Sequence, residues 1–76
     1  TREHGHLLRH QTLPPGTCSM LTAPRRVRVR ARAYNGAMVT VEADVIARSR
    51  EWVCLAQPDG TGVWNVWVHR GACTPL

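Results

Sequence analysis

The chain lacks phenylalanine, and no apolar run in it approaches the ~20 residues that a membrane-spanning helix needs. We therefore expect no contact with a membrane. The N-terminus has no apolar stretch typical of a signal peptide, which favours a cytoplasmic protein. Without phenylalanine, tryptophan and valine must supply much of the core, and a composition rich in valine and poor in leucine favours an all-β fold.

Motifs for catalysis and cofactor binding are missing as well. The acidic residues fall in the N-terminal region, in expected strands or in turns, and no nucleophile has a base at a recognisable spacing. We therefore expect a protein that is not an enzyme, holds no cofactor and has no small-molecule substrate.

The chain has three cysteines, and their spacing matches no disulfide framework. Cys18, Cys54 and Cys73 are an odd set with long intervals between them. A disulfide between Cys54 and Cys73 is conceivable if strands bring them together, but cytosolic thiols usually stay reduced. Cys54 lies between Val53 and Leu55 in an apolar run, so we expect it to be a core residue.

Histidines near the N-terminus raise the question of a zinc site. His4, His6, His10 and Cys18 are residue types that bind zinc. Their spacing is not a recognised structural-zinc pattern, so we assign no metal ligand. A zinc-stabilised regulator stays a third hypothesis, which melting in the presence of a chelator would test.

What the chain does contain is a strict alternation of arginine with small apolar residues in the segment 26–33. A period of two is typical of a strand with one face in the core and one in solvent. Tyr34, Asn35 and Gly36 then turn the chain. If these three residues form the loop, with Gly36 in the left-handed conformation, the apolar faces of the two strands match. A two-residue loop would instead place arginines opposite valines.

The three-residue loop also decides which arginines remain for a partner. It places Arg26 opposite Asp44 and Arg28 opposite Glu42, and such cross-strand pairs contribute roughly 0.2–1 kcal/mol each. The chain has ten basic residues against five acidic ones, and none is lysine. Arginine suits phosphate and carboxylate, although a GC-rich genome also favours it. The arginines of this strand without an acidic partner are Arg30 and Arg32.

The rest of the chain predicts further short strands. We expect one long strand over 38–48 with a bend at 45–47, strands over 52–56 and 63–69, a turn at 70–72, and a short last strand over 73–76. This layout resembles the small SH3-like barrels, which include Tudor, KOW and chromatin-associated modules. The resemblance covers residues 25–76 and lies in the layout, not in a motif. The expected fold has four to five antiparallel strands. The resemblance implies a binding module for nucleic acid or peptide, and an open OB-like barrel is the nearest alternative fold.

Residues 1–24 are expected to form a flexible or extended N-terminal arm that precedes the barrel domain. They contain Pro14, Pro15 and Gly16 and show no sustained periodicity. A short helical turn between Glu3 and His10 is possible, and the prolines would end it.

The strand over 63–69 provides the candidate site. Its even positions fit the core, so we expect Trp64 and Val66 to be buried together with Val29, Val41 and Leu55. Its odd face would then expose an aromatic residue beside polar ones, a composition that suits a binding surface. An alternative is that Trp67 packs under a loop or against the arm. The predicted binding patch is Arg30, Arg32, Trp67, His69 and Arg70.

Two functions fit this patch. The preferred hypothesis is a small adaptor or regulator that docks on a protein partner through Leu7, Leu8 and Leu13 of the arm and the Arg/Trp surface. The alternative is a barrel that binds DNA or RNA through the arginine row and Trp67. Salt distinguishes them, because only the binding of phosphates releases counterions.

Overall fold

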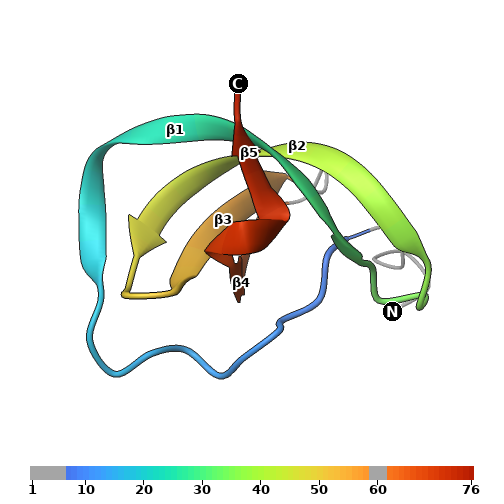
Figure 1. Ribbon diagram of the computed structural model, residues 1–76, viewed down its shortest axis with the longest axis horizontal. Coiled ribbons are helices and arrows are strands. Elements are labelled where there is room, and N and C mark those ends of the chain that lie inside the picture. The colour runs from blue at the N-terminus through green and yellow to red at the C-terminus, as the bar shows by residue number, and fades with distance from the viewer. Residues whose placement is uncertain (1–6, 59–61) are drawn as a thin grey trace.

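The computed structural model describes residues 7–58 and 62–76, which form a single sheet of five antiparallel strands (Figure 1). The strand order is β4-β3-β2-β1-β5. The expected all-β class is confirmed, and no helix in the described residues has the length and apolar character needed to cross a membrane. The elements are β1 (Ser19–Arg32), β2 (Met38–Arg48), β3 (Trp52–Pro58), β4 (Val63–His69), the 3-10 turn η2 (Arg70–Ala72) and β5 (Cys73–Pro75).

The β1–β2 hairpin has the register expected from the three-residue loop. Gly36 has a φ of 89°, and its amide donates to the carbonyl oxygen of Ala33 at 2.9 Å. Val29 pairs with Val41, and Arg28 pairs with Glu42. Asn35 supports the turn, because its side-chain oxygen accepts a hydrogen bond from the amide of Ala37.

Two irregularities bend the long strands. β2 shifts its register with β3 between Val45 and Ala47, where a bend was expected, and β1 shifts its register with β2 between Met20 and Arg25. An extra residue in one strand turns the following side chains to the other face. β1 also begins at Ser19, inside the segment that was expected to be an arm.

The main core lies on one face of the sheet. Val29, Leu55 and Val66 are buried as expected, and Val41 is half-buried against them. The prediction for Trp64 is wrong, because 40% of this residue is exposed. Trp64 pairs with Gln57 at the end of the hairpin where β3 ends and β4 begins. The amide of Leu8 donates a hydrogen bond to Gln57 Oε1 at 3.0 Å. Leu8 thus enters the core at the end where Trp64 was expected.

Trp67 is also placed differently from the prediction. It is 7% exposed and belongs to a second buried cluster with Ala47 and Cys54, to which Ile46 and Trp52 add. At this point β4 is covered on both faces. Its side chains alternate in direction, as predicted, but the side chains on both faces are buried. The expected burial of Cys54 is confirmed.

Residues 7–11, which were expected to belong to a flexible or extended N-terminal arm, are attached to the sheet. Leu8 forms a bridge with Ala33, the amide of Tyr34 donates to the carbonyl oxygen of Leu7, and that of Gln11 donates to the carbonyl oxygen of Trp67. The segment therefore connects the end of β1 to the edge of β4, and then runs below the sheet to the start of β1 (Figure 1). Residues 7–10 are not helical, and the rest of the expected helical turn lies outside the described residues.

Candidate functional site

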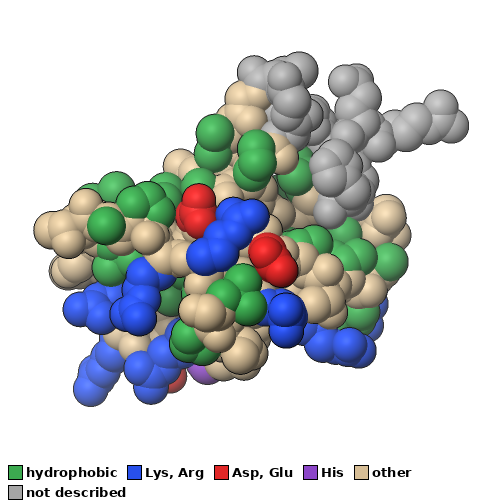
Figure 2. All heavy atoms as spheres, turned by 90° about the horizontal axis from the view of Figure 1, so that it is seen from above, with side chains coloured by type: hydrophobic (Ala, Val, Ile, Leu, Met, Phe, Trp, Pro, Cys, Tyr) green, Lys and Arg blue, Asp and Glu red, His purple; other side chains and the backbone are tan. Residues whose placement is uncertain are grey.

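On the outer face of the first hairpin, acidic side chains of β2 neutralise two arginines of β1. Arg26 lies 3.3 Å from Asp44, and both Arg26 and Arg28 lie 3.9 Å from Glu42. These pairs are exposed, so they contribute little to stability. They do occupy two carboxylates, and Figure 2 shows acidic side chains beside a basic one in the middle of this face.

The remaining arginines dominate the charge of the surface. Figure 2 shows basic side chains gathered toward the left end of the molecule. The guanidinium group of Arg32 donates to the carbonyl oxygen of Gly36 at 2.6 Å, a contact that leaves its charge without a counterion. Within residues 7–58 and 62–76, the arginines whose side chains have no ion pair or hydrogen bond are Arg9, Arg25, Arg30, Arg48, Arg50 and Arg70.

Arg9 and Arg30 of this set lie, together with Arg32, around a groove between the N-terminal segment and the first hairpin. The groove has a volume of about 420 Å³ and contains no carboxylate among its lining residues. We call it the arginine groove. It is lined by Arg9, His10, Gln11, Arg30, Ala31, Arg32 and Met38.

The backbone explains why these arginines meet. Leu8 and Ala33 form an antiparallel bridge, and the amide of Arg9 donates to the carbonyl oxygen of Arg32 at 3.1 Å. Leu8 and Ala33 point into the core, so the neighbouring Arg9 and Arg32 point outward on the same side. Like charges at opposed positions repel one another, and an anion between them would relieve this repulsion.

His10 and Gln11 attach the other side of the groove to β4. The amide of Trp67 donates to His10 Nδ1 at 3.3 Å, and the amide of His69 donates to Gln11 Oε1 at 2.9 Å. Because Nδ1 accepts this hydrogen bond, the neutral His10 ring carries its N–H at Nε2. His10 can offer that N–H as a donor to an anion.

The predicted patch is divided by the structure. Arg30 and Arg32 line the arginine groove, whereas Trp67 is buried and cannot provide the outward aromatic ring that was predicted. The side chain of His69 accepts a hydrogen bond from the amide of Gly71, and its ring meets Trp52 edge-on, with centroids 5.4 Å apart. Arg70 lines a different groove.

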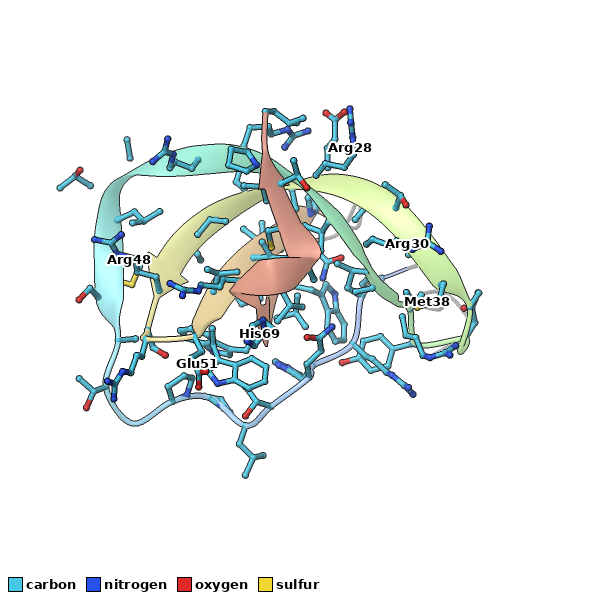
Figure 3. The ribbon with its side chains drawn as sticks, in the orientation of Figure 1. Arg28, Arg30, Met38, Arg48, Glu51 and His69 are labelled. Carbon is cyan, nitrogen blue, oxygen red and sulfur yellow. The ribbon has the colours of Figure 1, made fainter. Side chains whose placement is uncertain are left out.

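That second groove lies between β1, β2 and β5, and we call it the apolar groove. It has a volume of about 260 Å³. Figure 3 shows Arg30 and Met38 at one end of the molecule and Arg48 at the other, so the two grooves are separate. The apolar residues that line the apolar groove are Leu21, Val27, Val45, Val53, Cys73 and Pro75. The arginines that line it are Arg25, Arg48 and Arg70.

Arg9, His10 and Gln11 were not predicted as site residues, because they were assigned to a flexible or extended arm. The signal that could have placed them is the pair Leu7–Leu8, both of which are buried. The chain has few large apolar residues, so burial of two adjacent leucines stabilises the fold more than their exposure to solvent does.

Metal ligands do not cluster in the described part of the chain. His4 and His6 lie outside it, and the Nδ1 of His10 already accepts a hydrogen bond from β4. All three cysteines are free thiols. Burial raises the pKa of the Cys54 thiol, and an electrostatic interaction with Cys18 raises this pKa further. Burial also raises the pKa of the Cys73 thiol.

Comparison of the chain with protein-family models, with curated proteins and with solved structures returned no match. The two grooves and the charges around them are therefore the observations that bear on function.

Proposed function

We propose that this protein is a small non-enzymatic binding module with the layout of an SH3-like barrel, and that its arginine groove binds the phosphate backbone of a nucleic acid. Three features support the layout: the order β4-β3-β2-β1-β5, the bend in the long β2, and the turn η2 before the last strand. The attachment of residues 7–11 to both β1 and β4 supports closure of the barrel.

The observation that carries the binding proposal is the meeting of three guanidinium groups, from Arg9, Arg30 and Arg32, around a groove without a carboxylate. Arginine presents a planar set of donors that matches phosphate oxygens, and hydrogen bonds between charged groups are roughly twice as strong as neutral ones. His10 also lines this groove. Successive phosphates would replace the missing counterions.

The structure weakens the reasons for preferring a protein partner at this surface. Leu7, Leu8 and Trp67, which were expected to contact that partner, are used inside the protein itself. Leu13, at 85% exposure, is the one leucine of that set still available. Tyr34, which is 44% exposed and lies two residues after Arg32, offers a ring on which a base can stack.

The test is a fluorescence anisotropy titration of labelled single-stranded DNA, single-stranded RNA and duplex DNA at two salt concentrations. If three arginines each neutralise one phosphate of a single strand, log K should fall against log salt with a slope of about −2. The double variant Arg30→Gln with Arg32→Gln should bind more weakly, and its slope should be shallower by about 1.4.

Arg50→Gln is the matched control, because Arg50 is exposed, has no partner in the described part of the chain and lies outside the arginine groove. It should change the slope much less than the double variant does. No binding to any of these nucleic acids would overturn the proposal, as would equal slopes for the wild type and the double variant.

A further inference from the structure

The apolar groove is lined both by buried apolar side chains and by exposed arginines. Val27 and Val45 are buried and Val53 is half-buried, so the hollow rests on side chains of three neighbouring strands. Arg25, Arg48 and Arg70 are exposed and reach it from β1, β2 and η2. The hollow therefore has an apolar floor and a positively charged rim.

The rim has no counterion within the described residues. None of its three guanidinium groups makes an ion pair or a hydrogen bond there. Arg70 contacts Glu51 through the backbone only, because the amide of Arg70 donates to the carbonyl oxygen of Glu51 at 2.9 Å. Charge complementarity therefore requires an anionic occupant.

We propose that the apolar groove binds an acidic segment of a protein partner, with one apolar side chain of the segment on the valine floor and its carboxylates on the arginine rim. Guanidinium and carboxylate form two parallel hydrogen bonds in their favoured geometry. The occupant differs from that of the arginine groove, and this second site does not depend on nucleic-acid binding.

The floor decides between a peptide and a nucleic acid. The phosphate groups of a nucleic acid cannot cover Val27, Val45 and Val53, and placing their charge against these side chains costs solvation without compensation. An apolar side chain removes the same surface from water and is favoured for each square ångström it covers. A volume of about 260 Å³ is less than drug-sized ligands occupy, and it suits part of a peptide.

The edge of β1 offers a place for the peptide backbone. β5 pairs with β1 only from Val27 to Val29. In the described part of the chain no strand pairs with the corresponding edge of residues 19–24, and Leu21 of this stretch lines the groove. An extended peptide can add to such an edge, as in β-strand addition.

The first test is anisotropy titration of the full chain with a short fluorescein-labelled peptide in which acidic residues flank a central Leu-Val-Leu. The double variant Arg48→Gln with Arg70→Gln should weaken binding by about tenfold or more, because it removes two charge-assisted contacts. The matched double variant Arg30→Gln with Arg32→Gln, in the arginine groove, should weaken it by less than about twofold.

Two altered peptides separate the two parts of the site. Replacing the acidic residues by their amides should abolish measurable binding, and replacing the central apolar residues by glycine should weaken binding by about tenfold or more. Thermal melting of each protein variant verifies folding, and replacement of these exposed arginines should not affect it.

Cys73 provides a second, independent measurement. It lines the apolar groove as a free thiol, whereas Cys18 is exposed and lies outside this groove. Saturating peptide should slow the alkylation of Cys73 by iodoacetamide by about tenfold while leaving the alkylation of Cys18 unchanged. Because burial raises the pKa of Cys73, the reaction is followed at alkaline pH.

Three results would overturn the proposal. One is no binding of the acidic peptide to the wild-type protein. Another is a loss of binding that follows Arg30 and Arg32 instead of Arg48 and Arg70, which would place the peptide in the arginine groove. The third is displacement of the peptide and protection of Cys73 by single-stranded DNA, which would make this groove a second nucleic-acid site.

Discussion

At the scale of single residues, the two tryptophans of β4 contribute differently to the fold. Trp67 is nearly covered by the cluster that contains Ala47 and Cys54, whereas much of Trp64 remains in solvent at the end of the hairpin. Burial of an aromatic side chain is one of the largest single contributions to stability. The free energy of unfolding should therefore depend on Trp67 more than on Trp64.

Trp67→Ala is expected to lower the free energy of unfolding by about 3–5 kcal/mol, a large fraction of the total for so small a domain. Trp64→Ala, the matched control, should cost clearly less, because less apolar surface leaves water at this position. Urea unfolding followed by circular dichroism measures both. A larger loss for Trp64→Ala would contradict the burial described for β4.

At the scale of elements, the first hairpin is specified by local chemistry. The loop of Tyr34, Asn35 and Gly36 needs a residue with positive φ at its third position, and Gly36 provides it. The register that follows brings opposite charges together on the outer face and apolar residues together on the inner face. A one-residue slip would reverse both faces.

Replacing Gly36 by alanine should destabilise the protein by about 1–2 kcal/mol, because an L-residue is strained at this φ. No atom outside the loop lies within 4 Å of the added Cβ, so the effect would be one of backbone conformation and not of a clash. Gly16→Ala is the control: its φ is not positive and its surroundings are equally open. Thermal melting should show little change for Gly16→Ala, and equal losses for the two variants would contradict the loop geometry.

At the scale of the whole molecule, the N-terminal segment completes the core of the sheet. Leu8 is 1% exposed and belongs to the same core as Val29 and Leu55. Its amide is hydrogen-bonded to Gln57, 49 positions away. The segment also brings Arg9 to the arginine groove. Stability and the proposed binding are therefore coupled through these residues.

Leu8→Ala should reduce the free energy of unfolding by about 2–5 kcal/mol. Leu8→Met, with a similar volume, should retain most of it. Leu13→Ala should change it by no more than about 0.5 kcal/mol, since Leu13 is on the surface. Denaturant titrations of the three variants measure these differences. If Leu8→Ala were as stable as Leu13→Ala, the segment would not be part of the core.

The candidate site could be predicted only in part. Arg30 and Arg32 follow from the alternation and the register, because their partners across the strand are Thr40 and Met38 and not acidic residues. Arg9 and His10 could not be predicted, since their position depends on hydrogen bonds to Arg32 and Trp67. A periodic pattern says nothing about contacts between segments so far apart in the chain.

The sequence by itself determined the all-β class, the pairing of the first two strands and the neutralisation of Arg26 and Arg28. These properties depend on side-chain alternation and on one turn, both of which act over a few residues. The tertiary structure decided which tryptophan of β4 is buried, where Leu8 lies and which arginines meet in a groove. Each of these depends on the competition among distant segments for the same core volume and the same strand edge, and only the complete fold resolves that competition.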